Sequence, residues 1–84
     1  MCVDYQVKPE DIPKVLKVLV KNCVDLYCRE CDTPLPLIVS MYPSEGGKYW
    51  CLYIECLKCK FRNYLKDLES IGIEEIRKVV RGET

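Results

Sequence analysis

Two pairs of cysteines constrain this chain more than any other feature of its sequence. Cys28 and Cys31 form the first pair, Cys56 and Cys59 form the second, and 24 residues separate the two pairs. Two thiols three positions apart can bind one metal ion from a tight turn. A second such turn completes a tetrahedron of soft sulfur ligands, which suits Zn²⁺. The spacing therefore predicts one structural zinc ion held by four thiolates.

The length of the chain explains why a metal would matter for its stability. A chain of 84 residues forms a single domain, 1–84, and a domain this small gains little stability from burial alone. Metal binding contributes on the order of 10 kcal/mol in small domains of this kind. We therefore expect folding and zinc binding to be one event.

Charge and composition narrow the function classes. Thirteen basic and thirteen acidic residues give zero formal charge, and histidine is absent. Four thiolates and one Zn²⁺ leave the loaded protein mildly acidic, which disfavours non-specific DNA binding. The N-terminus lacks signal-peptide features, and no apolar run reaches the length of about 20 residues that spans a bilayer. We expect a soluble cytoplasmic protein with no membrane partner, and the lack of alanine hints at a thermophilic source.

Hydrophobic periodicity predicts an α+β fold in three parts. Residues 1–26 contain a strand (3–7) and the start of a helix (9–27), residues 27–65 hold the cysteines, and residues 66–84 form a C-terminal helical segment. Two strand-like runs, 35–42 and 48–55, flank a glycine-containing turn and predict an antiparallel hairpin. Residues 61–65 return as a third strand. The expected architecture is a small antiparallel sheet flanked by an N-terminal and a C-terminal helix.

The order of these elements resembles the zinc-ribbon group. A cysteine turn, a hairpin, a second cysteine turn and a further strand follow one another over residues 27–65. By that resemblance the ligands are Cys28, Cys31, Cys56 and Cys59, and the fold is the small three-stranded sheet of proteins that take part in transcription, translation and RNA polymerase assemblies. Many ribbons carry glycine after each cysteine pair, whereas this chain carries Asp32 and Lys60.

Other uses of the cysteines are weaker alternatives. A rubredoxin-like iron centre takes the same four ligands, so an iron electron carrier stays open as a rival. The spacing of Cys23, Cys28 and Cys31 matches part of a plant-type ferredoxin motif, but Cys23 falls within a helical pattern. Cys23 and Cys51 are expected to be buried free thiols, with a disulfide between them as the alternative, and Cys2 an exposed one.

Two groups of residues are candidates for contacting a partner. The strand 48–55 is apolar on both faces, with Tyr49 and Tyr53 on one of them. That face is either covered by a terminal helix or forms an aromatic patch for a partner. Basic residues cluster at and after the second cysteine pair, where they either contact nucleic acid or stabilise the thiolates: Lys58, Lys60, Arg62 and Lys66.

A four-thiolate zinc site has no open position for water or substrate, so the metal is structural and we expect no enzyme activity. The sequence predicts a small zinc-binding interaction or adaptor protein, by analogy in a transcription or other nucleic-acid-handling assembly. A protein is the expected partner. Direct nucleic-acid binding and a homodimer, with Val18 on an exposed helix surface, stay open as alternatives.

Overall fold

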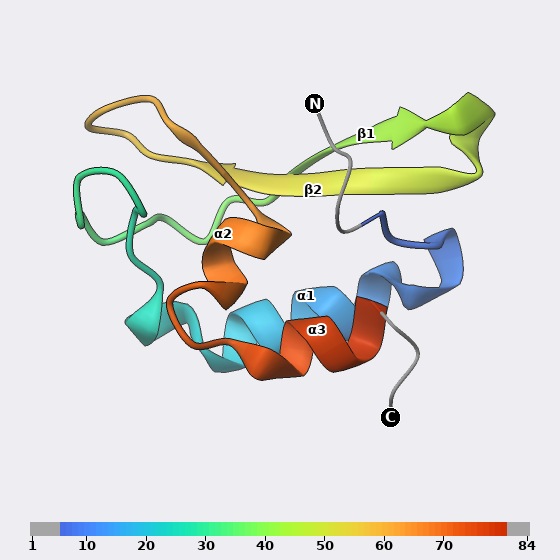
Figure 1. Cartoon of the computed structure of the whole chain (residues 1–84), viewed down its shortest axis with the longest axis horizontal. Coiled ribbons are helices and arrows are strands. Elements are labelled where there is room, and N and C mark those ends of the chain that lie inside the picture. The colour runs from blue at the N-terminus through green and yellow to red at the C-terminus, as the bar shows by residue number, and fades with distance from the viewer. Residues whose placement is uncertain (1–5, 81–84) are drawn as a thin grey trace.

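The computed structural model of this protein describes residues 6–80, which form two layers: a sheet, and helices on one side of it (Figure 1). The sheet is antiparallel with strand order β1-β2-β3. Its strands are β1 (Ser40–Ser44), β2 (Tyr49–Glu55) and β3 (Arg62–Tyr64). The α-helices are α1 (Ile12–Lys21), α2 (Leu65–Glu69) and α3 (Glu74–Val80). This confirms the predicted α+β class, with one N-terminal α-helix and two C-terminal ones.

The hairpin forms where the sequence predicts it, but its first strand is shifted. Gly46 and Gly47 take positive φ angles of 70° and 89° in the 3-10 turn η3 (Glu45–Gly47), a conformation that glycine adopts without strain. β1 begins at Ser40, whereas the prediction placed the strand at 35–42. Pro36 lies in the predicted strand and has no N–H group for a sheet hydrogen bond, so the chain before Ser40 stays irregular.

Strand β2 divides the molecule into a buried and an open side. Leu52 and Ile54 point toward the helices and are fully buried there, while Tyr53 points to the opposite face. At the edge of β2 that faces away from β1, Val7 exchanges two backbone hydrogen bonds with Trp50, of 2.9 and 2.8 Å. The predicted N-terminal strand therefore joins β2 at Val7, and the rest of that prediction, residues 3–5, lies outside the described residues.

The first helix is shorter than the prediction of 9–27. It starts with a 3-10 turn, η1 (Pro9–Asp11), and the α-helix ends at Lys21. Asn22 is its C-cap, with non-helical backbone angles (φ −106°, ψ 16°), and its side-chain amide donates to the carbonyl oxygen of Val18 at 2.8 Å. A second 3-10 turn, η2 (Cys23–Asp25), follows.

Three side chains differ from their predictions, and the early helix end explains the first of them. Cys23 leaves the buried stripe and is an exposed free thiol. Cys51 is buried as expected, but it is disulfide-bonded and not a free thiol. Because Cys23 is free, the alternative of a disulfide between these two residues is wrong as well. Val18 is half-buried and packs against the core, so it does not form the predicted exposed position on the helix.

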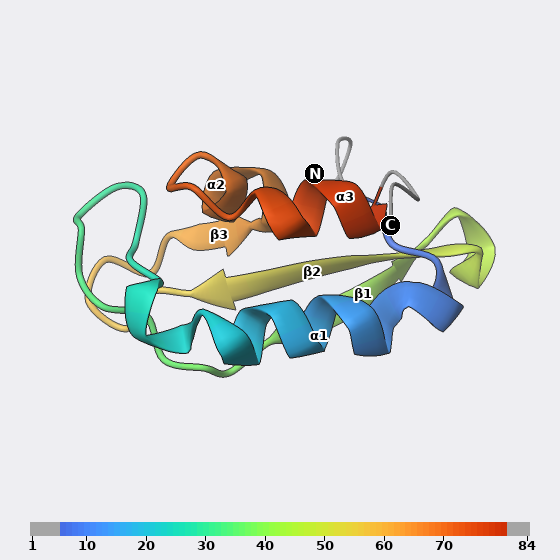
Figure 2. The same cartoon turned by 90° about the horizontal axis from the view of Figure 1, so that it is seen from below.

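Helices α1 and α3 lie side by side beneath the sheet (Figure 2). Buried side chains from all three helices form one core with the helix-facing side of β2: Val15 and Leu19 from α1, Ile76 from α3, and Leu65 and Leu68 from α2. An exposed ion pair between Lys21 Nζ and Glu75 Oε1, at 3.4 Å, also links α1 and α3. Among the described residues, the helices are all too short or too polar to cross a lipid bilayer.

Candidate metal centre

The four paired cysteines come together in space, as their spacing predicts. The Sγ atoms of Cys28, Cys31, Cys56 and Cys59 all lie within 4.8 Å of one another. Two of the sulfur pairs, Cys28 with Cys59 and Cys31 with Cys56, are 3.5 Å apart. In a tetrahedral site with Zn–S bonds of about 2.3 Å, the sulfur atoms lie about 3.8 Å from one another. The four thiols therefore form a cluster of the size that one metal ion requires.

Two turns of the same construction supply these thiols, and we call residues 28–33 the first knuckle and residues 56–61 the second knuckle. In the first, Cys28 N donates to Thr33 O at 2.8 Å, and Asp32 N donates to Cys28 O at 2.9 Å. In the second, Cys56 N donates to Phe61 O at 2.9 Å, and Lys60 N donates to Cys56 O at 3.0 Å. The two knuckles thus share one hydrogen-bond pattern at equivalent positions.

The residue after each cysteine pair takes a left-handed backbone conformation. Asp32 has a φ angle of 58° and Lys60 has one of 65°. These are the positions at which many zinc ribbons carry glycine, and a residue with a side chain adopts this conformation at a cost of roughly 1–2 kcal/mol. The turn geometry therefore survives without glycine, at the expense of local backbone strain.

Each knuckle closes a pair of antiparallel chain segments. The second knuckle joins the end of β2 to the start of β3. The first knuckle joins a shorter pair, in which Leu35 N donates to Leu26 O at 2.9 Å and Tyr27 bridges Pro34. Both cysteine pairs are thereby fixed by backbone hydrogen bonds on either side, and their side chains face each other.

Backbone N–H groups surround the first cysteine of each pair. Lys58 N and Cys59 N point at Cys56 Sγ, at 3.4 and 3.5 Å. Burial raises the pKa of Cys28, but hydrogen bonds from the backbone of Cys31 and Glu30 outweigh it, so that the net pKa lies below 9.0. Such N–H groups stabilise the thiolate form, which is the form that binds a metal.

The second cysteine of each pair has a different environment. The pKa of Cys31 is lowered to about 6, chiefly because the Thr33 hydroxyl lies 3.1 Å from its sulfur. A hydrogen bond with the Phe61 backbone lowers the pKa of Cys59, but burial and the three neighbouring sulfurs raise it, with a net value of about 12. Four adjacent thiols resist ionising together, and a bound divalent cation supplies the charge that keeps all four as thiolates. The donor set therefore fits a thiophilic metal such as zinc.

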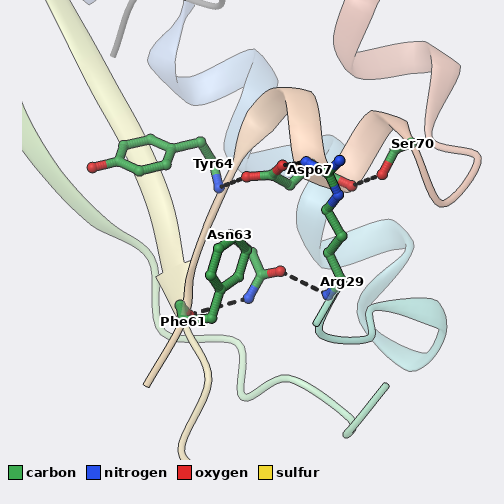
Figure 3. A network of polar contacts seen from close by, with 6 residues as sticks. All are labelled: Arg29, Phe61, Asn63, Tyr64, Asp67 and Ser70. Carbon is green, nitrogen blue, oxygen red and sulfur yellow. Dashed lines mark hydrogen bonds and ion pairs between the residues drawn. The ribbon is translucent and has the colours of Figure 1, made fainter. Parts of the chain in front are cut away.

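A buried asparagine holds the first knuckle against the sheet (Figure 3). Asn63 Oδ1 accepts a hydrogen bond from Arg29 N at 2.9 Å. Its side-chain amide donates to the carbonyl oxygens of Ile54 and Phe61, both at 3.3 Å. Asn63 is fully buried, so it links Arg29 in the first knuckle to β2 and to the second knuckle.

A buried aspartate extends this connection to helix α2 (Figure 3). Asp67 is 3% exposed, and its Oδ1 pairs with Arg29 Nη1 at 2.5 Å. Its Oδ2 accepts a hydrogen bond from Tyr64 N at 3.1 Å, at the start of α2. Neither Asn63 nor Asp67 was predicted as part of the site. The one signal in the sequence is that Asp67 is an acidic residue three positions after Tyr64, the residue that precedes α2, where a carboxylate commonly caps a helix start.

The two tyrosines predicted to contact a partner lie on the open side of the sheet. Tyr53 packs there with Tyr42 and Tyr64, with ring centroids 6.1 and 5.3 Å away. The hydroxyls of Tyr42 and Tyr64 are 3.1 Å apart. We call this the tyrosine face, defined by Tyr42, Tyr53 and Tyr64. Tyr49, at the start of β2, lies under Lys48 Nζ at 5.9 Å. All three α-helices lie on the other side, so none of them covers the tyrosine face.

The predicted basic cluster comes from three different elements. Arg62 belongs to the tyrosine face, where its guanidinium lies 5.0 Å from the Tyr53 ring centroid and its Nε lies 3.9 Å from Glu55 Oε1. Lys58 and Lys60 are exposed in the second knuckle. Lys66 is exposed on α2, which packs on the helix side of the sheet (Figure 1). Arg62 is therefore the member of this cluster that joins the predicted aromatic residues.

The structure thus contains a possible four-cysteine metal site on a small antiparallel sheet, and beside it an aromatic face that none of the helices within residues 6–80 covers. No protein-family model matches this chain, and neither a curated protein nor a solved structure matches it.

Proposed function

We propose that this protein is a small zinc-binding interaction module in which one structural Zn²⁺ is held by Cys28, Cys31, Cys56 and Cys59. The observation that carries this proposal is the cluster of four Sγ atoms within 4.8 Å, supplied by two knuckles of the same construction. Four soft thiolate donors suit zinc, and a closed set of four leaves no position for a reacting water or substrate. The metal's task is then to hold the two knuckles together.

The open side of the sheet supports a role in binding a partner, in place of an enzymatic role. Tyrosine and arginine are enriched at the centres of protein interfaces, and the tyrosine face combines three tyrosines with Arg62. The resemblance to the zinc-ribbon group points to a partner in transcription or another nucleic-acid-handling assembly. This part of the proposal rests on analogy with that group.

Direct binding of single-stranded nucleic acid is a second candidate, because Arg62 lies over the ring of the half-buried Tyr53, and tyrosine rings at a surface can stack on bases. Such binding releases counterions and falls steeply as salt rises. Affinity for an oligouridylate should then weaken in Lys60→Ala and Arg62→Ala. Binding that is absent, or that does not change with salt, excludes this candidate.

Native mass spectrometry of the full chain, purified without added metal, tests the main proposal. One zinc per chain is the expected result. One iron per chain, with a coloured protein and a redox couple, would replace it with the rubredoxin-like electron carrier, which uses the same four ligands. A folded chain that holds no metal would overturn both. The same spectrum gives the number of subunits, so it also tests for a homodimer.

A further inference from the structure

A groove lies beside the second knuckle, on the open side of the sheet. It has a volume of about 190 Å³ and is lined by Pro36, Ile38, Ser40, Tyr53, Glu55 and Leu57. Ile38 and Leu57 are 64% and 67% exposed, although both are large aliphatic side chains. Tyr53 belongs both to the groove and to the tyrosine face, so the two surfaces are continuous. An exposed aliphatic pair that joins an aromatic face is typical of an interaction site.

The size of the groove limits what it can hold. Sites for cofactors and drug-sized ligands have volumes of about 300 Å³ or more. A groove of about 190 Å³ is smaller and has room for one or two side chains. Four of its six lining residues are apolar or aromatic, so an apolar side chain of the occupant fits it.

The charges around the groove decide between a peptide and a nucleic acid. Glu55 is the one charged residue among the six that line it, and its side chain is 44% exposed. Arg62 Nε lies 3.9 Å from Glu55 Oε1, at the outer limit of ion pairing, and its guanidinium lies over the Tyr53 ring. The Glu55 carboxylate therefore keeps room for a second cation. A phosphate backbone would meet this carboxylate and two aliphatic side chains, which disfavours nucleic acid here.

The metal centre positions one wall of this groove. Leu57 directly follows the metal ligand Cys56 and stands within the second knuckle, whose N–H groups point at Cys56 Sγ. Ile38, on the segment that leads into β1, belongs to no knuckle. The width of the groove thus depends on where the cysteine cluster holds Leu57.

From the volume, the lining and the single carboxylate, we infer that this groove docks a short segment of a partner protein. That segment places a large apolar side chain between Ile38 and Leu57 and a neighbouring Lys or Arg against Glu55. The inference deepens the proposed function and rests on it, because the metal holds the Leu57 wall in place.

The test begins with a random peptide library displayed on phage and selected against the full metal-loaded chain. Enriched peptides should share a large apolar residue with a Lys or Arg close to it. A synthetic enriched peptide then serves as the probe in calorimetric titrations. Ile38→Asp and Leu57→Asp should each weaken its binding about tenfold or more, because each removes an apolar contact from the groove. Val24→Asp is the matched control, since Val24 is a 78% exposed valine outside the groove, and it should leave the affinity unchanged.

A charge exchange tests the carboxylate separately. Glu55→Lys should weaken binding of the probe peptide, and replacing the basic residue of that peptide by Glu should restore part of the affinity. Native mass spectrometry of each variant shows whether it still holds the metal. The wild-type chain could prove to contain no metal after purification and still bind the peptide, with weaker binding in Ile38→Asp and Leu57→Asp. That result would refute the zinc proposal and support the docking site.

Several results would overturn the docking inference itself. One is a selection that enriches no peptide. Another is an enriched peptide that binds the Ile38→Asp and Leu57→Asp variants with the same affinity as the wild-type chain. Oligouridylate binding that Leu57→Asp abolishes would make nucleic acid the occupant. A concentration-dependent dimer that the same variant dissociates would make a second copy of this chain the occupant. In these last cases the metal content of the wild-type chain still tests the proposed function independently.

Discussion

The two knuckles have the same backbone construction but are attached to the rest of the molecule to different degrees. The first is tied inward, because Arg29 donates its backbone N–H to the buried Asn63 and its guanidinium to the buried Asp67. The second is bonded by Asn63 at its end, Phe61 O, and its residues 57–60 are all exposed. Equal turns are thus used once as an anchor and once as an exposed surface.

This difference shows how a small metal site can serve two purposes. A metal ion bound between the knuckles would connect the exposed one to the anchored one through the four sulfurs. Residues 57–60 of the second knuckle would then gain a fixed position, although the buried Asn63 bonds that knuckle at its end, Phe61 O. A short chain with a small core benefits from this arrangement, because the metal replaces packing that its length does not provide.

Removing one ligand from either knuckle should have the largest effect. Cys28→Ser in the first knuckle and Cys59→Ser in the second should both abolish metal retention and unfold the chain, since metal binding contributes on the order of 10 kcal/mol in such domains. Native mass spectrometry and far-ultraviolet circular dichroism measure the two outcomes. Cys23→Ser, at an exposed free thiol outside the cluster, is the control and should change neither.

An unequal response of these two ligand variants would break the comparison. If Cys59→Ser kept both metal and fold while Cys28→Ser lost them, the first knuckle would bind the metal without the full set of four ligands. The second knuckle would then be an appendage that the metal does not position.

Weakening the anchor should have the next largest effect. Asp67→Ala leaves Arg29 and the backbone N–H of Tyr64 without their acceptor and should lower the free energy of unfolding by about 2–3 kcal/mol. Denaturant unfolding, followed by the fluorescence of the single tryptophan, Trp50, measures this change. All variants are compared at one fixed zinc concentration, because metal binding shifts the apparent stability.

The ion pair between Lys21 and Glu75 provides the control for that variant. Its members are well exposed, so Lys21→Ala should change stability by less than about 1 kcal/mol. A loss of the same size in Lys21→Ala and Asp67→Ala would show that Asp67 is an ordinary surface charge and not an anchor of the first knuckle.

Asn63→Ala tests the same anchor at the backbone. It should lower the free energy of unfolding by about 1–2 kcal/mol, because Arg29 N loses its acceptor and the side-chain amide of Asn63 no longer donates to Ile54 O. Amide hydrogen exchange adds a local measurement. The Arg29 amide should exchange faster in this variant, while the Lys60 amide, which donates to Cys56 O, should keep its wild-type rate. Equal acceleration at both amides would mean that Asn63 supports the two knuckles alike.

The cysteine cluster and the antiparallel sheet could be predicted from the sequence because each depends on short-range patterns. Two matched pairs of cysteines, each three residues apart, indicate two turns that bind one metal ion, and two strand-like runs around a glycine-containing turn indicate a hairpin. Because the strand 48–55 is apolar on both faces, its sequence left open whether a helix covers the face with Tyr53. The prediction that Cys28, Cys31, Cys56 and Cys59 come together is confirmed by the cluster of sulfurs. The identity of the metal and of the partner stays a prediction.

The predictions from the sequence were wrong or incomplete where the contacts of a single residue override the hydrophobic pattern of its neighbours. The helical pattern of 9–27 continues past Lys21, but Asn22 caps the helix there with its side-chain amide on the Val18 carbonyl oxygen, and Cys23 beyond it is exposed. Asn63 and Asp67 were missed because their partner Arg29 is more than thirty positions away, with sequence separations of 34 and 38. A buried polar residue whose partner is distant in sequence looks like a surface residue until the fold brings them together.

The smallest expected effect concerns the one strained feature that the knuckles share. Lys60→Gly should raise the free energy of unfolding by about 0.5–1 kcal/mol, because glycine adopts a positive φ without the cost that a side chain incurs. Asp32→Gly should raise the free energy of unfolding by a smaller amount, since aspartate tolerates the left-handed conformation better than lysine does. Lys58 lies in the same knuckle but has no positive φ angle. Lys58→Gly should therefore lower the free energy of unfolding by roughly 0.4–1 kcal/mol, because glycine gives the unfolded chain more conformational freedom. If Lys60→Gly were as destabilising as Lys58→Gly, the left-handed turn would carry no strain, and the absence of glycine after each cysteine pair would cost this chain nothing.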